Sequence, residues 1–328
     1  MNATEISLSN VRSAQTRIKD LVHYTPVYSS TQLSNRLGIE LFFKCENLQK
    51  TGSFKVRGVL NKVLNLGEVE KSRGLVTISA GNHAQALAWA ATVFGIQCTV
   101  VMPETASKIK IRATEEYGAE VVLSGDVFAA FEKTLQIERE EGKILVHPFE
   151  DKFIIAGHGT VGLEVLEQLE NIDAIVVGIG GGALSSGIAI AVKEQNPKIK
   201  VYGVEPEGAN AMQESLAAGK PIQLHKVNTI ADGLAPPMAG KVPFGIIKKY
   251  MDDVVTVSDE EIGSAVIDLL TRTKLLVEPA GAAATAAILS KKIPLSKGQR
   301  VVSILSGGNM DLDRLSEIIL ENDLNTRR

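Results

Sequence analysis

The chain has 328 residues, 45% of them hydrophobic and 22% charged, and its 35 basic and 38 acidic residues give a formal net charge of −3. This length suits one large or two modest domains, and the near-neutral balance without a basic block excludes an obvious nucleic-acid-binding surface. Two cysteines, Cys45 and Cys98, make no disulfide framework or metal knuckle, and a polar N-terminus with no apolar run of 18 residues predicts a cytoplasmic protein.

Short β-branched runs alternate with amphipathic helical stretches along the chain. We expect strands, in chain order, at residues 40–46, 75–79, 98–103, 119–125, 144–148, 174–179, 200–206, 254–258 and 300–307. We expect helices between them, most clearly at residues 82–95, 108–119, 126–142 and 160–170. The strands are continuous apolar runs, which indicates parallel sheets with both faces covered. The sequence therefore predicts an α/β doubly wound fold, in which ligands bind beyond the carboxyl ends of the strands.

The first unusual turn precedes a lysine, in the stretch NLQKTGSFKVRG of residues 47–58. Ser53 can cap a helix that begins near Phe54, and this places Lys55 in the first helical turn. The positive end of the helix dipole disfavours an ammonium there, so we expect a lowered pKa for Lys55. Such an amine suits Schiff-base chemistry, whereas a solvated surface lysine is the alternative.

The second unusual turn, Ser-Ala-Gly-Asn-His at residues 79–83, joins an expected strand to an expected helix. Backbone N–H groups at such a helix start can bind a carboxylate. The alternative is simple capping of the helix by Ser79 or Asn82.

The third unusual turn is rich in glycine and lies in the stretch AIVVGIGGGALSSG of residues 174–187. Its backbone N–H groups and the dipole of the helix that follows suit a phosphate. The spacing Gly178-x-Gly180-x-x-Ala183, with Glu205 ending the next strand, also satisfies the dinucleotide fingerprint, so an NAD-dependent oxidoreductase is an open alternative.

The last unusual turn, Ser306 followed by Gly307-Gly308-Asn309, ends the final strand. An amine, a phosphate site and a carboxylate site together indicate a phosphorylated aldehyde cofactor and an amino-acid substrate.

These motifs, taken in order, make the chain resemble the fold-type II pyridoxal-phosphate enzymes, specifically the serine/threonine dehydratase (threonine ammonia-lyase) and serine racemase group. The matching stretches are KCENLQKTGSFKVRG, SAGNHAQA, GIGGGALSSG, GVEPE, TIADGLA, VEPAGAAA and SGGN. They run through nearly the whole chain, and several ordered motifs are far more specific than one fingerprint, which then becomes a coincidence.

The resemblance implies a two-domain, tryptophan-synthase-β-like architecture with mostly parallel open sheets covered by helices. A small domain of residues 66–150 would be inserted in a large domain of residues 1–65 and 151–328. The implied cofactor is pyridoxal 5′-phosphate, and the implied assembly is a homodimer or homotetramer without nucleic-acid or membrane partners.

The activity that the resemblance implies is β-elimination from a 3-hydroxy amino acid such as L-threonine or L-serine, which gives a 2-oxo acid and ammonia. Serine racemase or threo-3-hydroxyaspartate dehydratase activity on the same fold stays open, as does a catalytically silent binding protein.

The resemblance also implies roles for individual residues. Lys55 would form the Schiff base with the cofactor and move the Cα proton, and Ser79 is the second residue assigned to catalysis. The cofactor ring would contact Phe54, Asn82 through its 3-hydroxyl, and Ser306 through its nitrogen, with Gly233 and Glu278 lining the site. The cofactor phosphate would be bound by the backbone of Gly180, Gly181, Gly182, Ala183 and Leu184. The substrate carboxylate would be held by Ser79, Ala80, Gly81, Asn82 and His83.

The chain departs from the family in three places. Ala183 stands where the glycine loop often has a fourth glycine, which leaves backbone binding intact. Ala80 stands where racemases carry a second serine as acid and base, so we do not expect efficient racemisation. A divalent-cation site, for Mg²⁺ for example, would use Glu205 and the Ala209 carbonyl, but Ala211 replaces its further carboxylate.

Overall fold

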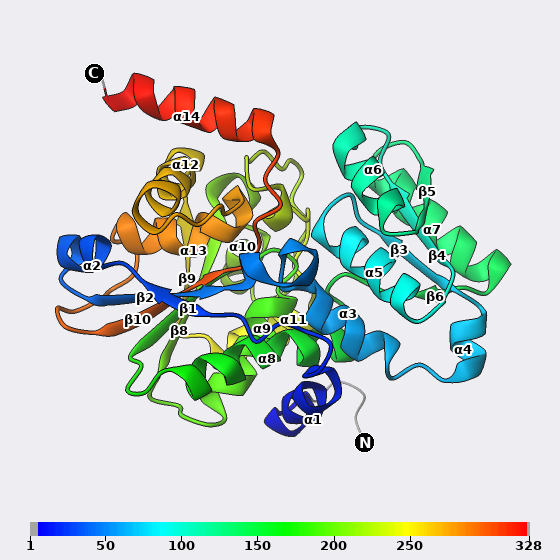
Figure 1. The fold of residues 1–328 in the computed structure, drawn as a ribbon, viewed down its shortest axis with the longest axis horizontal. Coiled ribbons are helices and arrows are strands. Elements are labelled where there is room, and N and C mark those ends of the chain that lie inside the picture. The colour runs from blue at the N-terminus through cyan, green and yellow to red at the C-terminus, as the bar shows by residue number, and fades with distance from the viewer. Residues whose placement is uncertain (1–5, 327–328) are drawn as a thin grey trace.

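The computed structural model describes residues 6–326 and contains two β-sheets with helices packed around them (Figure 1). The larger sheet has six strands in the order β1-β2-β10-β7-β8-β9. Their bounds are β1 Val27–Ser29, β2 Glu40–Cys45, β7 Ala174–Gly178, β8 Lys200–Pro206, β9 Asp253–Val257 and β10 Arg300–Leu305. Neighbouring strands are parallel except β1 and β2. This sheet confirms the predicted α/β fold.

The smaller sheet has four parallel strands in the order β5-β4-β3-β6 and lies to the right in Figure 1. Its strands are β3 Leu75–Ile78, β4 Cys98–Met102, β5 Glu120–Leu123 and β6 Ile144–Leu145. All four lie within residues 66–150, and all strands of the larger sheet lie outside that range. The domain division at these residues stays a prediction, with which the two sheets agree.

Fourteen α-helices among residues 6–326 connect and cover the strands. The first seven are α1 Leu8–Ile18, α2 Thr31–Leu37, α3 Lys55–Val63, α4 Glu68–Ser72, α5 Asn82–Val93, α6 Lys108–Glu116 and α7 Val127–Glu141. The others are α8 Lys152–Gln168, α9 Ala183–Lys193, α10 Ala211–Ala218, α11 Lys241–Tyr250, α12 Asp259–Asp268, α13 Pro279–Leu289 and α14 Leu312–Thr326. No helix in this part of the chain is both long and apolar enough to cross a bilayer.

Strand β7 shows how the larger sheet is buried on both faces. Ile175 and Val177 pack in the core formed with α8 and α9, whereas Ala174 and Val176 pack in the core formed with α12 and α13. Successive side chains of a strand point to opposite faces, so a strand covered on both sides must be apolar throughout. This is why the buried strands read as continuous apolar runs in the sequence.

The predicted elements differ from the structure in three places. The short antiparallel strand β1 was not predicted, and β6 is limited to Ile144 and Leu145. Helix α8 begins at Lys152 rather than residue 160, because Asp151 caps it by accepting hydrogen bonds from the backbone N–H groups of Phe153 (2.7 Å) and Ile154 (3.2 Å).

Glycines bring helices α3, α8 and α9 into direct backbone contact. A Cβ atom on Gly157 of α8 would lie 2.5 Å from the Arg57 carbonyl oxygen of α3. A Cβ atom on Gly159 of α8 would lie 2.7 Å from the Gly187 carbonyl oxygen of α9. Helix α8 therefore fixes the separation between the helix that begins at Lys55 and the helix that follows the glycine-rich turn.

Candidate active site

The unusual turns lie at the topological switch points of the two sheets. In the smaller sheet, the chain leaves β3 toward β4 on one side, and β6 flanks β3 on the other. In the larger sheet, β7 leads on to β8 and β9, while β10 and β2 lie on its opposite side. Ligands of open α/β sheets bind at such points, beyond the carboxyl ends of the strands. The turns after β3, β7 and β10 occupy these positions.

Lys55 is held next to the end of β10. Helix α3 begins at Lys55, and the backbone N–H of Phe54 donates to the Ser306 carbonyl oxygen at 3.1 Å. Ser53 forms a β-bridge with Gly307. The prediction that Ser53 caps the helix is wrong: Phe54 is the N-cap residue, and the buried Ser53 hydroxyl has no hydrogen-bond partner among the described residues. The backbone of β10, instead of a cap, positions the lysine.

The Lys55 amine lies in a partly buried position and is not a solvated surface group. Its Nζ donates to the Pro148 carbonyl oxygen at 3.5 Å and lies 5.1 Å from the centre of the Phe54 ring. Burial lowers the pKa of Lys55 to about 8, although the negative charge of Glu278 acts in the opposite direction. The expected lowering is confirmed, with desolvation as its main cause.

The glycine-rich turn presents bare backbone at the start of α9. Gly182 is the N-cap residue, with φ of 93°, a conformation that favours glycine, and no side chain caps the helix. A Cβ atom on Gly181 would clash with the Phe149 ring, and one on Gly180 would lie 3.1 Å from the Gly233 carbonyl oxygen. An uncapped helix start with close backbone approach fits the phosphate of pyridoxal phosphate.

The turn at residues 79–83 presents a second bare helix start. Helix α5 begins at Asn82 after the N-cap residue Gly81, and no side chain caps it. The alternative of capping by Ser79 or Asn82 is therefore wrong. The Ser79 hydroxyl instead accepts a hydrogen bond from the Gly81 N–H at 3.2 Å. The backbone N–H groups at this helix start fit a carboxylate.

Asn82 lies at the start of α5, beside the smaller sheet, and it makes hydrogen bonds to residues that lie beside the larger sheet. Its Nδ2 donates to Glu278 Oε1 at 2.6 Å, and its Oδ1 accepts from Asn309 Nδ2 at 2.7 Å. The Glu278 N–H donates to the Gly307 carbonyl oxygen at 3.1 Å. Burial raises the pKa of Glu278 to about 7, against the hydrogen bond from Asn82, which lowers it. The structure thus brings together residues of the turns after β3 and β10 with the start of α13.

The remaining predicted residues lie around these turns. Ala183 and Leu184 begin α9 and are buried, and Ala80 is partly buried. Gly233 approaches Ala280 closely, since a Cβ atom on Gly233 would lie 2.8 Å from Cβ of Ala280. The rings of Phe54 and His158 meet edge-on, and their centres are 4.6 Å apart. The roles of these residues stay predictions.

Sequence reasoning missed the segment between β6 and α8. His147 Nδ1 accepts hydrogen bonds from the backbone N–H groups of Phe149 (3.2 Å) and Glu150 (3.0 Å). This arrangement places Phe149 on the glycine-rich turn and the Pro148 carbonyl at Lys55. A His-Pro-Phe segment after a short strand is a weak local pattern, so only the tertiary fold reveals it.

Two buried histidines, His83 and His158, and the partly buried His147 surround this part of the molecule. Burial lowers the pKa of His83 to about 3 and that of His147 to about 4, and it holds the pKa of His158 well below its usual value. The Nε2–H of His83 donates to the Val146 carbonyl oxygen at 3.0 Å. All three rings are therefore neutral at pH 7.

Glu205 has a structural partner in the position predicted for a metal. Its two carboxylate oxygens accept backbone N–H groups of Met212 and Gln213 at the start of α10, each at 2.8 Å. No group of three or more histidine, cysteine, aspartate or glutamate residues that could hold a metal occurs in residues 6–326. The predicted use of Glu205 and the Ala209 carbonyl as metal ligands stays a prediction. The same two hydrogen bonds occupy the carboxylate that a dinucleotide ribose would need.

The comparisons with known proteins agree with this geometry. The pyridoxal-phosphate dependent enzyme family matches residues 18–307. L-threonine ammonia-lyase of Thermotoga maritima is 44% identical over 96% of this chain and 78% of its own length. Serine racemase of Dictyostelium discoideum has a TM-score of 0.88 at 42% identity, covering 93% of this chain and 99% of its own. The threonine deaminase of T.th. has the same TM-score at 41% identity, covering 93% and 99%. This chain belongs to the family of pyridoxal-phosphate-dependent enzymes.

Proposed function

We propose that the protein is a dehydratase (ammonia-lyase) that converts a 3-hydroxy amino acid, such as L-threonine or L-serine, to a 2-oxo acid and ammonia. The observation that carries the proposal is the Lys55 amine, whose pKa is lowered to about 8, in a site with two uncapped helix starts. The L-threonine ammonia-lyase of Thermotoga maritima supports the choice of reaction.

Each of the two helix starts would bind a different anionic group. Backbone N–H groups of residues 180–184 would hold the cofactor phosphate at the start of α9, and those of residues 79–83 would hold the substrate carboxylate at the start of α5. Asn82 and Ser306 would hold the cofactor ring. Pyridoxal phosphate, when bound, supplies an electron sink for the charge left at the substrate Cα.

Lys55 carries out the proton transfer. With a pKa near 8, about a tenth of the amine is unprotonated at pH 7, far more than for a lysine at its ordinary pKa, and this fraction can accept the Cα proton. The β-hydroxyl takes up a proton and leaves as water, and hydrolysis, which consumes one water, then gives the 2-oxo acid and ammonia.

Lys55→Ala tests the proposal against Lys71→Ala, which removes a lysine paired with Glu68 on α4 at 2.8 Å, away from the site. We expect Lys55→Ala to lower 2-oxo acid formation by about 10³-fold or more. It should also remove the visible absorbance of the purified protein, while Lys71→Ala keeps both. Equal turnover in the two variants contradicts the proposal. L-Threonine, L-serine and threo-3-hydroxyaspartate, assayed side by side, identify the substrate.

Serine racemase activity is a second candidate, supported by the likeness to the Dictyostelium enzyme. Ala80 has no proton to give on the second face of the substrate, so elimination is the favoured reaction. A homodimer or homotetramer in the cytoplasm completes the proposal, and sedimentation of the purified protein together with cell fractionation tests it.

A further inference from the structure

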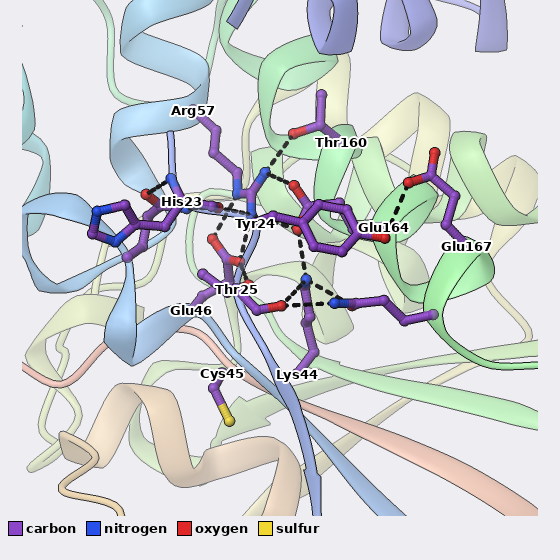
Figure 2. A network of polar contacts seen from close by, with 12 residues as sticks. His23, Tyr24, Thr25, Lys44, Cys45, Glu46, Arg57, Thr160, Glu164 and Glu167 are labelled. Carbon is purple, nitrogen blue, oxygen red and sulfur yellow. Dashed lines mark hydrogen bonds and ion pairs between the residues drawn. The ribbon is translucent and has the colours of Figure 1, made fainter. Parts of the chain in front are cut away.

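Four ionised side chains form a buried cluster beneath the helix that carries Lys55 (Figure 2). We call Lys44, Glu46, Arg57 and Glu164 the buried ion cluster; their side chains are at most 5% exposed. They come from β2, the short helix Glu46–Leu48, α3 and α8. Burial alone would raise the pKa of Glu46, but Arg57 holds it below its usual value, so the carboxylate is ionised. Two positive and two negative charges balance.

Arg57 lies at the centre of the cluster, between the two carboxylates (Figure 2). Its Nε and Nη2 donate to the two oxygens of Glu46 at 2.7 and 2.8 Å. Its Nη1 and Nη2 donate to the two oxygens of Glu164 at 2.6 and 2.9 Å. Thr160 Oγ1 and the His23 carbonyl oxygen accept further hydrogen bonds from Nη1 and Nη2 at 3.2 and 3.3 Å. A guanidinium with every nitrogen engaged has one allowed position.

Lys44 contacts Glu164 directly and is linked to Glu46 through Thr25, whose Oγ1 donates to Glu46 Oε1 at 2.5 Å. Its Nζ donates to Glu164 Oε2 at 2.5 Å, to the Thr25 carbonyl oxygen at 2.8 Å and to Gln168 Oε1 at 2.9 Å. It makes no hydrogen bond to Glu46 or Arg57 among the contacts of the described residues. Lys44 thus belongs to the cluster without joining the two ends of the segment that carries Lys55.

Stability alone does not account for such a cluster. Desolvation of buried charges offsets most of their attraction, and well-packed apolar side chains of the same volume serve stability as well or better. Unlike apolar groups, the charged side chains also fix the orientation of the elements that carry them, because each hydrogen bond requires one geometry.

The Glu46–Arg57 pair closes the chain segment that holds Lys55. Between these two residues the backbone forms two short 3₁₀ turns and then enters α3. Thr51 and Gly52 both have left-handed φ values, of 57° and 72°. The turn after β10 holds the middle of this segment, since the Gly308 N–H donates to the Gly52 carbonyl oxygen at 2.9 Å and the Phe54 N–H donates to the Ser306 carbonyl oxygen at 3.1 Å. The ion pair adds a second hold, at the two ends of the segment.

Arg57 also anchors the side of α3 opposite to Lys55. Two residues of an α-helix differ by roughly 200° in direction, so the two side chains point away from each other. Gly58 then brings α3 onto α8, since a Cβ atom there would lie 2.7 Å from the Ile154 carbonyl oxygen. Helix α8 also contacts α9. The ion pairs that hold Arg57 therefore also influence the distance between Lys55 and the glycine-rich turn.

We propose that the Glu46–Arg57 ion pair is a positioning device, which closes residues 47–56 and fixes the Lys55 amine relative to the glycine-rich turn. Glu46 and Arg57 are positioning residues that act through Lys55 and do not touch the substrate. The inference rests on the proposed function, in which Lys55 moves the Cα proton.

The test compares Glu46→Gln with Lys44→Met in the holoenzyme. Each variant leaves one uncompensated charge in the cluster, but only Glu46→Gln breaks the pair that closes the segment. We would measure the denaturant midpoint, kcat and KM for L-threonine, and the visible circular dichroism of the bound cofactor. The dichroism, normalised to bound cofactor, reports the geometry at Lys55 independently of turnover.

We expect both variants to lower the denaturant midpoint by similar amounts. Only Glu46→Gln should lower kcat, by about 10²-fold for a displacement of the Lys55 amine by about 1 Å. Its KM should stay unchanged, because the substrate carboxylate is bound at the start of α5. Its dichroism should weaken, and Glu46→Asp, which restores the charge, should recover part of both signals. Equal falls of kcat in Glu46→Gln and Lys44→Met overturn the proposal.

A charge-neutral double variant, Glu46→Met with Arg57→Met, keeps the proposal testable if Glu46→Gln does not fold. It leaves the Lys44–Glu164 pair balanced and fills the space with apolar side chains. We expect a folded enzyme with reduced kcat and altered dichroism, and normal values of both overturn the proposal. Absence of 2-oxo acid formation by the unaltered protein would refute the proposed function instead, so the two failures are distinguishable.

Discussion

Gly157→Ala tests whether the contact between α3 and α8 sets the geometry of the site. The added Cβ atom would lie 2.5 Å from the Arg57 carbonyl oxygen and 2.6 Å from Gly58 Cα. Carbon atoms pack at about 3.5 Å or more, so the two helices must separate by roughly 1 Å. Both neighbours are backbone atoms, and neither can rotate away.

The energetic cost follows from two opposing effects. Overpacking of a tight contact costs about 1–3 kcal/mol, and a clash with backbone belongs at the upper end. Replacing glycine by alanine inside a helix returns about 1 kcal/mol. We therefore expect Gly157→Ala to lower the free energy of unfolding by about 2 kcal/mol.

Gly245→Ala is the matched control, because Gly245 lies on an exposed part of α11 and an added Cβ atom would meet nothing within 4 Å. It should raise the free energy of unfolding by up to about 1 kcal/mol. Denaturant unfolding of both variants measures the difference of about 3 kcal/mol between them.

The same displacement should affect catalysis. A shift of about 1 Å between Lys55 and the glycine-rich turn should lower kcat by up to about 10²-fold in Gly157→Ala and leave Gly245→Ala unchanged. If Gly157→Ala is as stable and as active as Gly245→Ala, then α8 does not fix the distance between α3 and α9, and the packing account of the site is wrong.

Two further predictions concern the reaction and the stability of the fold. Ala80→Ser places a hydroxyl at the position that racemases use. Chiral chromatography should then detect more D-serine formed from L-serine, while 2-oxo acid formation continues. An unchanged amount of D-serine would contradict the role given to residue 80. Burial raises the pKa of Glu205 to about 8, so the folded protein retains a proton that the unfolded chain loses near pH 4.5. Stability should fall as the pH rises from about 4.5 to about 8, and Glu205→Gln should flatten that slope in denaturant midpoints; parallel slopes in the two proteins would contradict it.

The sequence predicted those parts of the fold that depend on local pattern. A strand buried on both faces must be apolar throughout, so the run at residues 174–179 was sufficient to place β7. A lysine that follows Ser53-Phe54 at a helix start, and glycines between a strand and a helix, likewise carry their physical meaning locally. Taken together, these features predicted that Lys55 and the glycine-rich turn belong to one site.

Long-range pairing was beyond the sequence. Lys44 lies inside an apolar strand run, and its partner Glu164 is 120 residues away on α8. Nothing in the local pattern distinguishes it from a lysine at a strand edge. Glu205 similarly satisfies a ribose-binding pattern and a metal-binding pattern, and neither pattern indicates that its carboxylate accepts hydrogen bonds from the first turn of α10. Local motifs state what a side chain can bind, whereas the topology decides what it meets.

The helices that begin at the site start without a side-chain cap, as do α11 and α13, whereas several other helices are capped. Asp126, Asp151 and Ser258 cap α7, α8 and α12 with their side chains. Helices α3, α5 and α9, which begin at the site, have no side-chain cap. A missing cap costs about 1 kcal/mol of stability and leaves backbone N–H groups without a protein partner. At α5 and α9 those groups are where a carboxylate and a phosphate would bind, so the ligands would complete the helices that hold them.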